Sequence, residues 1–482
     1  MELTTTYHNT SSELYPPTAS REERKSLDDL LRFYYPNGPI HKAVALYSGS
    51  GISNILSINS SFYRINELLC RVEGRPSYDA QLDTTLVAGG KGFSIPGAML
   101  GALGESIERF SGILFSMETE IKRGTYTDLV AAGVPCIHPD EFPLFAEEQY
   151  AQPGFLFDPF TVDSPLGWVQ GRRLISGDEV WIPAQLALFF YGAHKGEDVV
   201  GYSASSGMAC HVTEDAAVYG GITELLERDA LMAGWYCRIP PKQIQIDREI
   251  DDPLLNRFHQ DISGLPGELG CYLHETDIPN TFTVSAIQAA PYLKQYAYFA
   301  GAATGVDIDE AIGHGLVEYG QSEAQIRLAL AAPARSWARG IEMHFGISAD
   351  KPASEMTTFL ENIGHYGHRV HIGKLQWFLE EGDEIALSSI PRRPFDSAAE
   401  SLEDLKATLS ERGIDPIVID NTPSQFEQLR VMKVVIPELI QPHVAARAYL
   451  GHPRLRTLPV DMGLTDTPLS FSDLAPGPVP FP

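Results

Sequence analysis

Hydrophobic and polar positions follow two different periods along this chain, and each period predicts a different element. A helical spacing of apolar residues predicts four helices, at residues 98–112, 214–235, 309–330 and 401–411. Alternating residues at 281–286 and 296–300, and an apolar run at 417–419 before a turn, predict strands. Because helices and strands mix along the chain, we expect an α/β (mixed α+β) fold.

The two ends of the chain differ in composition from the rest. Residues 1–35 are rich in Thr, Ser, Glu and Lys, which predicts an N-terminal extension. Residues 36–482 contain no linker that would separate domains, so we expect one folded unit. It ends in a Pro-rich tail, 475–482, where prolines favour extended geometry.

Targeting signals and cysteine spacing bear on the compartment. The sequence shows no secretory signal and no apolar run long enough to span a bilayer. Its five cysteines are widely spaced and form no C-x-x-C motif. We therefore expect reduced thiols, a cytoplasmic location and no membrane association.

Three of the predicted helices carry the same arrangement of small and oxygen-bearing residues. Two small residues and two oxygen-bearing side chains stand at relative positions 0, 4, 7 and 10, on one helix face. The sets are Ala98, Ala102, Glu105 and Glu108; Ala217, Gly221, Glu224 and Glu227; and Ala311, Gly315, Glu318 and Gln321. The small residues would let another backbone approach closely. The paired carboxylates repel each other unless a cation neutralises them.

The charge of the chain narrows what these carboxylates can bind. With 63 acidic and 36 basic residues, the formal charge is −27, which argues against nucleic acid or an anionic membrane as a partner. One such helix alone would more often be a solvated surface helix, whereas three with one spacing favour a Mg²⁺ site. Arg109 and Arg228 follow two of the carboxylate pairs and suit phosphate oxygens. The Gly-rich segment around Lys91 can approach an anion, although the P-loop spacing is absent. These residues together indicate a nucleoside triphosphate held through Mg²⁺.

From about residue 36 to its end, the sequence resembles the YcaO family. Three blocks carry the resemblance: G-K-G-F-S-x3-A-x3-A-x2-E-x2-E-R at 90–109, S-S-G-M-A followed by E-L-L-E-R-D-A at 205–230, and A-I-x-H-G-L-V-E-x2-Q-S at 311–322. Shorter matches downstream are G-I-D-P-I-V-I-D-N-T, V-V-I-P-E-L and L-G-H-P-R-L. The resemblance implies a YcaO-type ATP-binding fold that is neither P-loop nor kinase.

The resemblance also implies which residues bind ATP and Mg²⁺. The metal positions are Glu105, Glu108, Glu224, Glu227 and Glu318. The nucleotide positions add Lys91, Arg109, Ser206, Arg228, His314 and Gln321, with Arg109 and Arg228 also assigned to catalysis. Three positions depart from the family pattern, since Ser206 replaces an Asn, Ala216 an acidic residue and His314 a basic one. The contacts at these three positions stay open.

The ending P-x-P-x-P, at 478–482, resembles that of the azoline-forming cyclodehydratases of thiazole/oxazole-modified peptides. In the implied reaction, a Cys, Ser or Thr side chain attacks the preceding carbonyl of a precursor peptide, and ATP phosphorylates the hemiorthoamide oxygen. The tail would direct the carboxylate of Pro482 into the site as a catalytic group. Two alternatives are a non-catalytic scaffold subunit with a degenerate nucleotide site, and an enzyme that activates amides for thioamide or amidine formation.

The resemblance further implies partners. The sequence shows no fused leader-binding domain, so we expect a separate ThiF-like or RiPP-recognition-element protein that holds the leader peptide. An FMN-dependent azoline dehydrogenase is a further expected partner, within a hetero-oligomer or a homodimer.

Other histidines and cysteines invite a catalytic or metal-binding interpretation. His365, His368 and His371 have metal-like spacing, but their surroundings suggest a loop without carboxylate ligands, so we expect no metal there. Cys210 and His211 are adjacent in sequence, which does not establish a nucleophile–base pair, and we expect them to be lining or core residues.

Overall fold

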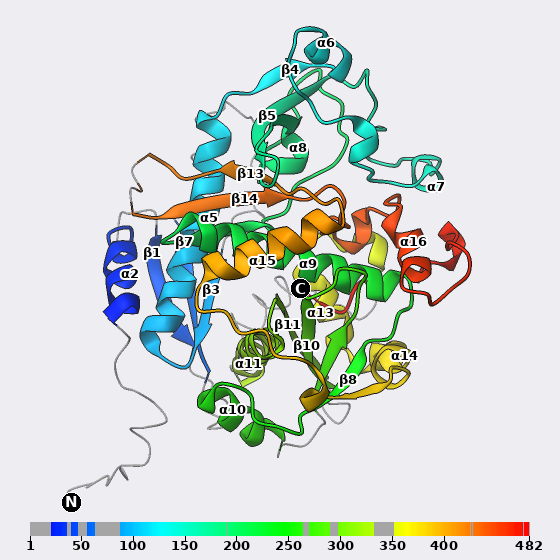
Figure 1. Ribbon diagram of the computed structural model, residues 1–482. Helices are drawn as coiled ribbons and strands as arrows, with labels where there is room; N and C mark the ends of the chain where they lie inside the picture. Colours follow the sequence, from blue (N-terminus) through cyan, green and yellow to red (C-terminus); the bar gives the residue numbers. More distant parts are fainter. Residues whose placement is uncertain are drawn as a thin grey trace, which may run out of the picture.

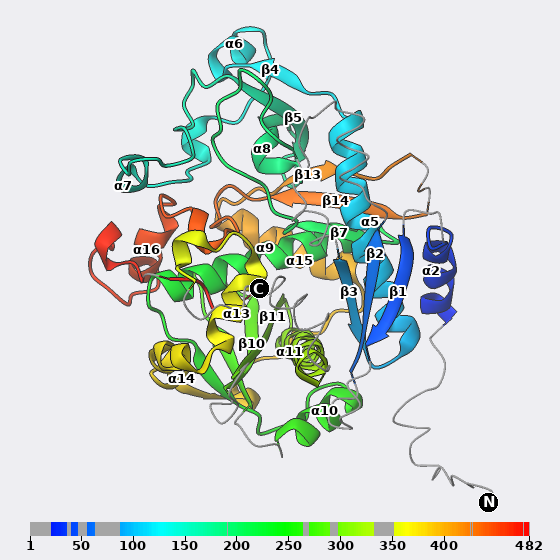
Figure 2. The same cartoon turned by 180° about the vertical axis from the view of Figure 1, so that it is seen from behind.

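The structure is a computed structural model built around three sheets (Figures 1 and 2). It describes residues 21–35, 40–46, 55–62, 87–189, 191–263, 269–289, 297–331, 351–424, 426, 428–475 and 477–481. The mixed α+β fold predicted from the sequence is confirmed. No helix in these ranges is long and apolar enough to cross a membrane.

The first sheet is antiparallel and carries the first of the three patterned helices. Its order is β1 (Ile40–Leu46), β2 (Leu56–Phe62) and β3 (Val87–Gly92). Helix α5 (Ile95–Glu118) packs on β2 and β3, and α2 (Arg21–Leu31) packs against α5. Within the expected N-terminal extension, residues 21–31 are therefore helical, and Leu30 is buried in a cluster with Leu103 and Ile107.

The second sheet joins strands from distant parts of the sequence. Its order is β4 (Lys122–Gly124), β5 (Leu166–Arg173), β13 (Ile417–Asp420), β14 (Arg430–Val435) and β7 (Met208–His211), with β6 (Glu179–Pro183) paired to β5. All of these pairings are antiparallel. Helix α9 (Glu214–Tyr236) packs on β7 and β14, and α15 (Ala398–Glu411) packs on α9.

The third sheet has the order β11 (Tyr298–Gly305), β10 (Phe282–Ala289), β9 (Leu269–His274), β8 (Lys242–Gln245) and β12 (Glu384–Ala386). Only the β8–β12 pairing among these is parallel. Helix α11 (Ile308–Ala331) packs on β10 and β11. Further α-helices within the described ranges are α6 (Tyr126–Ala131), α7 (Glu147–Tyr150), α8 (Ala184–Ala187), α10 (Pro253–Ser263), α13 (Phe359–Gly367), α14 (Gln376–Glu380) and α16 (Arg454–Asp461).

The three patterned helices connect the three sheets in a closed cycle. Helix α5 lies on the first sheet and also contacts β7 and β14 of the second. Helix α9 lies on the second sheet and also contacts β9, β10 and β11 of the third. Helix α11 lies on the third sheet and also contacts β1, β2 and β3 of the first. This arrangement brings one patterned helix to each junction between sheets (Figure 1).

The four helices and the strands predicted from periodicity are confirmed, with small shifts of their ends. Ser94 and Thr213 cap α5 and α9, because their side chains accept hydrogen bonds from Gly97 N and Ala216 N. Helix α5 therefore begins three residues before the apolar pattern that predicted it. The predicted strand at 296–300 begins at Tyr298, and residue 296 lies outside the described residues.

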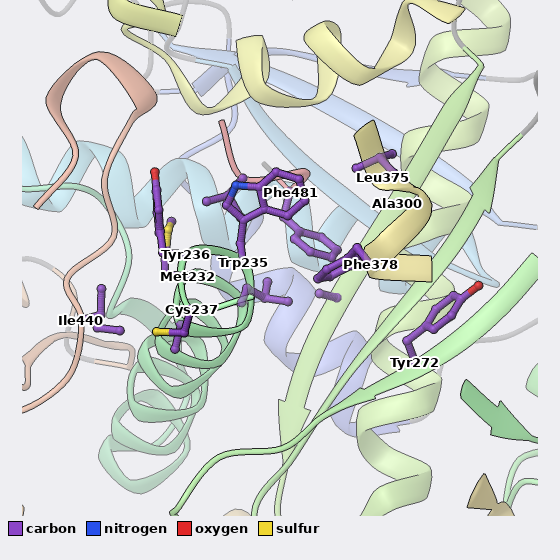
Figure 3. Close-up of a cluster of buried hydrophobic side chains, with 14 of the residues drawn as sticks. Met232, Trp235, Tyr236, Cys237, Tyr272, Ala300, Leu375, Phe378, Ile440 and Phe481 are labelled. Atoms are coloured by element: carbon purple, nitrogen blue, oxygen red, sulfur yellow. The ribbon is translucent and has the colours of Figure 1, made fainter. Parts of the chain in front are cut away.

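The C-terminal tail is buried in the centre of the molecule (Figure 1). Phe481 is 2% exposed and lies among the aromatic and aliphatic side chains at the end of α9 (Figure 3). Two tyrosine hydroxyls fix the tail backbone: Tyr366 Oη donates to Pro478 O at 2.7 Å, and Tyr298 Oη donates to Pro480 O at 2.9 Å. The predicted catalytic residue Pro482 lies outside the described residues.

A buried ion pair fixes α9 against the C-terminal region. Asp229 is fully buried and accepts from Arg454 Nε at 2.8 and 2.9 Å and from Ile440 N at 3.0 Å. Arg454 belongs to the L-G-H-P-R-L segment and Asp229 to the E-L-L-E-R-D-A segment. The pair therefore joins two segments that the sequence had marked only by resemblance.

Candidate nucleotide and magnesium site

Helices α5 and α11 pack their small residues against the backbone of the strand that precedes them, and Gly221 of α9 lies against Gly207 in the turn before β7. A Cβ atom on Gly90 of β3 would lie 1.8 Å from Ala98 O and 2.3 Å from Ala102 N. A Cβ atom on Gly301 of β11 would lie 2.7 Å from Gly315 O of α11. The close backbone approach predicted from the small residues is thus confirmed. We call β3–α5, β7–α9 and β11–α11 the three strand–helix units.

The first glutamate of each pattern is oriented by a backbone amide of its own strand–helix unit. In each case Oε2 accepts from a main-chain N–H that lies 16 or 17 residues earlier. The pairs are Gly89 N with Glu105 at 2.8 Å, Gly207 N with Glu224 at 3.0 Å, and Ala302 N with Glu318 at 3.3 Å. A carboxylate that accepts a backbone hydrogen bond is held in one rotamer, so the three side chains are fixed before any ligand binds.

Two cations contact the other oxygens of these glutamates. Arg109 Nη2 donates to Glu105 Oε1 at 2.8 Å, and Lys91 Nζ lies 3.0 Å from Glu318 Oε1. Lys91 is on the first sheet and Glu318 on the helix of the third, so this pair crosses a junction. The four side chains remain 20–32% exposed, so a ligand can reach them from solvent.

The second glutamates lie deeper and lack full compensation by positive charge. Burial, together with the charge of the neighbouring Glu105, raises the pKa of Glu108 to about 8. Its Oε1 accepts from Cys210 N at 2.8 Å, which joins α5 to β7. Burial also raises the pKa of Glu227 to about 8, because the charges of Glu318 and Glu224 add to burial and outweigh the opposing effect of Arg228.

The carboxylates of the three helices therefore act on one another. Glu224 raises the pKa values of both Glu108 and Glu227, and so it links the groups on α5 and α9. Burial would raise the pKa of Glu318, but Lys91 and Arg228 hold it below its usual value. The three predicted sets of carboxylates come together because each patterned helix lies on one sheet and also contacts the next.

Polar residues at the remaining predicted nucleotide positions surround this group. His314 lies on α11, and its residue surface is exposed. Desolvation of the imidazole by the protein around it lowers its pKa, and the positive charge of Lys91 contributes in the same direction. Arg228 Nη1 lies 3.7 Å from Glu227 Oε1. Gln321 is half-buried one turn beyond Glu318, and Ser206 is buried in the turn before β7.

The donor set fits Mg²⁺ together with a polyphosphate. Carboxylate oxygens are the ligands that this hard cation prefers, and Glu108 and Glu227 are held in the acid form until positive charge arrives. In the described ranges, no three His, Cys, Asp or Glu side chains are grouped so that they could hold a metal ion by themselves. The site therefore fits a cation that one or two carboxylates share with phosphate oxygens, rather than an all-protein cage.

Lys433 is part of this region, although the sequence reading did not single it out. It lies on β14, is 3% exposed, and its Nζ donates to Ala204 O at 2.9 Å and Ser206 O at 2.7 Å. Burial lowers its pKa to about 8, against the opposing effect of Glu224. Its signal in the sequence was a lone charged residue inside the apolar run 431–436.

Packing accounts for two of the three spaced histidines and for Cys210, whereas His211, expected to be a lining or core residue, is exposed. The predicted loop around the three histidines is wrong for two of them, because His365 lies in the last turn of helix α13 and His371 lies in a 3₁₀ helix, Arg369–Leu375. The two imidazoles stack with ring centroids 3.8 Å apart. Burial raises the pKa of the Cys210 thiol far above its usual value, with Glu108 adding to the effect, so this thiol is not an activated nucleophile.

Comparisons with known proteins give a matching family profile and several structures with the same fold. The profile of the YcaO family, described as a cyclodehydratase that binds ATP and Mg²⁺, matches residues 89–440. A heterocyclase solved in complex with substrate and cofactor shares the fold, with a TM-score of 0.74 and 18% identity over 95% of this chain. The present chain covers 57% of the length of that heterocyclase.

Two further structures match over nearly their whole length. YcaO from Methanopyrus kandleri, bound with AMPPCP and Mg²⁺, has a TM-score of 0.57 and 16% identity over 89% of this chain and 94% of its own. A chain of the E. coli microcin synthetase McbBCD complex has a TM-score of 0.55 and 15% identity over 88% of this chain and 93% of its own. At these identities the likeness establishes the fold.

Proposed function

The chain belongs to the YcaO family of ATP- and Mg²⁺-binding cyclodehydratases, and from this premise we propose that it forms azoline rings in a precursor peptide. The substrates would be Cys, Ser or Thr residues, and the products thiazoline or oxazoline. The observation that carries the proposal is the convergence of three strand–helix units, each with an amide-oriented glutamate, on one group of carboxylates and cations.

The difficult step of this reaction is the loss of an oxygen atom. Attack of the substrate thiol or hydroxyl on the preceding carbonyl gives a hemiorthoamide, which collapses back unless its oxygen becomes a leaving group. Transfer of the γ-phosphoryl group of ATP to that oxygen gives ADP, and loss of phosphate together with the amide proton closes the C=N bond. Phosphoryl transfer depends mainly on positioning and on charge neutralisation, which the carboxylates and cations of this site can supply.

Individual side chains then take separate tasks. We assign Lys91, Arg109 and Arg228 to the phosphates, because each is a cation beside a patterned glutamate. Ser206, His314 and Gln321 would complete the nucleotide contacts. Each Mg²⁺ would be held by one or two of the five glutamates together with phosphate oxygens, and when bound it neutralises phosphate charge and lowers the barrier to transfer. The anchored tail supports a role for the Pro482 carboxylate as the base that removes substrate protons.

The proposal includes partner proteins. The likeness to a chain of the McbBCD complex supports a hetero-oligomer, in which a ThiF-like or RiPP-recognition-element protein holds the leader peptide. An FMN-dependent dehydrogenase would oxidise the azolines in a later step. The four described cysteines are free, which supports a cytoplasmic location.

The nucleotide part of the proposal can be tested on the chain by itself. Calorimetric titration with AMPPCP and Mg²⁺ should give saturable binding that Glu227→Gln abolishes. Glu214→Gln, at a half-exposed glutamate of the same helix, is the matched control and should bind normally. An absence of binding by the wild-type protein would favour the scaffold alternative and would refute the proposal.

The cyclisation part needs the complete reaction. With ATP, Mg²⁺, a precursor peptide and its leader-binding partner, each ring should remove about 18 Da, because ring closure is a net loss of water after phosphoryl transfer. Phosphate release should require the peptide. A peptide that instead gains sulfur would identify the thioamide-forming alternative.

A further inference from the structure

The turn before β7 has every carbonyl of residues 204–207 engaged. Lys433 Nζ holds Ala204 O and Ser206 O. Met208 N donates to Ser205 O at 2.9 Å, and Val434 N donates to Gly207 O at 2.7 Å. With its carbonyls fixed, the turn directs the Gly207 N–H at Glu224 Oε2, 3.0 Å away.

The backbone of Gly207 makes this turn sensitive to its supports. Its φ of +81° lies in the left-handed region that favours glycine. A Cβ atom there would lie 2.4 Å from Val434 O, so the turn fits tightly against β14. Movement of the turn away from β14 would therefore carry the Gly207 amide away from Glu224.

The charge of Lys433 is unusual for a buried side chain. Its Nζ donates to two neutral carbonyls, those of Ala204 and Ser206. Neutral partners alone do not compensate a buried ammonium group, which needs negative charge nearby. Among the charged groups that act on it, Glu224 is the carboxylate and Arg109 the opposing cation.

We propose that Lys433 is a positioning residue of the nucleotide site, which holds the 204–207 turn so that the Gly207 amide orients Glu224. This inference rests on the proposed function, because Glu224 is one of the glutamates assigned there to Mg²⁺ and nucleotide. Lys433 acts from outside the ligand group, through the turn. By this inference Lys433, a residue of β14 that is far from α5 and α11 in the sequence, contributes to the affinity for nucleotide and Mg²⁺.

The test measures AMPPCP–Mg²⁺ affinity by calorimetry, together with thermal unfolding. Lys433→Met, which removes the charge and the donors, should weaken affinity at least about tenfold, as removal of supports behind metal ligands commonly does. Val435→Ala is the matched control, because Val435 is a buried residue two positions along the same strand. It should lower the unfolding temperature and leave affinity unchanged.

Coupling to Glu224 separates a positioning role from general support of the sheet. If Lys433 acts through Glu224, adding Lys433→Met to Glu224→Gln should weaken binding no further than Glu224→Gln alone. Lys433→Arg keeps charge and donors and should restore most of the affinity; it also serves if Lys433→Met does not fold. Additive losses, or a loss matched by Val435→Ala, would overturn the inference. Absence of wild-type binding would instead refute the proposed function.

Discussion

Removal of the Phe481 side chain should release the C-terminal tail while the rest of the fold persists. This side chain is 2% exposed, and its ring lies 6.1 Å from that of Phe378 and 5.8 Å from that of His274. A buried Phe removes roughly 200 Å² from water, worth about 5 kcal/mol at about 25 cal/mol per Å². Phe481→Ala should therefore cost about 3–5 kcal/mol.

Because the tail is a chain end, most of this loss should appear as local opening. A cost of about 3–4 kcal/mol increases the open fraction of the tail by about 10²- to 10³-fold. Hydrogen exchange of the C-terminal peptide, followed by mass spectrometry, measures that fraction. Azoline formation should fall sharply, whereas AMPPCP–Mg²⁺ affinity should stay close to that of the wild type.

The control is Leu464→Ala, at a residue that is 56% exposed in the same C-terminal region. It should change neither hydrogen exchange nor ring formation. If Phe481→Ala leaves the tail protected, the packing estimate is wrong. If the tail opens and ring formation continues at the wild-type rate, the tail has no part in catalysis.

Four other predictions follow from burial, charge and packing. Binding of AMPPCP–Mg²⁺ at pH 7 should release protons, because Glu108 and Glu227, with pKa raised to about 8, lose theirs when the cation arrives. The raised pKa values also make the stability of the folded, unliganded protein depend on pH. Their contribution to stability is complete below the ordinary carboxyl pKa of 4.5 and is lost as the pH rises through about 8. The unfolding temperature of the unliganded protein should therefore decline between about pH 4.5 and pH 8. Proton release on binding is measured by calorimetry in buffers of different ionisation enthalpy. If no proton is released, Glu108 and Glu227 are not the groups that the ligand deprotonates. In Gly301→Ala the added Cβ would meet the backbone of α11, so this change should destabilise the fold by about 1–3 kcal/mol and weaken nucleotide binding. The matched control is Gly104→Ala on α5, where the added Cβ enters open space and should stabilise the fold by about 0.5–1 kcal/mol. Arg454→Met leaves a buried carboxylate unpaired and should cost about 3–5 kcal/mol in denaturant unfolding; a cost below 1 kcal/mol would refute that estimate.

The three patterned helices could be predicted from the sequence because their small residues and their oxygen-bearing residues share one helical period. Small residues at positions 0 and 4 and oxygen-bearing residues at 7 and 10 lie on one face whatever the tertiary structure is. The close approach of Gly90 to Ala98 and Ala102 follows from that face. Helix α5 begins before its apolar pattern because Ser94 caps it, and it also continues to Glu118, beyond its predicted end at residue 112.

The contacts between strand–helix units could not be predicted in the same way. The pairing of Lys91 with Glu318 joins different sheets, and Lys433 reaches the 204–207 turn from 227 and 229 residues away. No local period records such contacts, since they depend on how the three sheets close into a cycle. The helix that contains His365 also depends on tertiary contacts. The residues around it suggest a loop by their local sequence, but the burial of Tyr366 and its neighbours stabilises a helix there.

The short span of the three amide–glutamate hydrogen bonds has a consequence for folding. Contacts between residues 16 or 17 apart cost little loop-closure entropy, so each strand–helix unit can acquire its oriented glutamate early and independently. Repulsion between carboxylates of different units arises only when the units meet, and it adds to the repulsion already present within each helix. If the proposed Mg²⁺ and nucleotide bind there, they would neutralise this repulsion and so also favour the final docking of parts that are already formed.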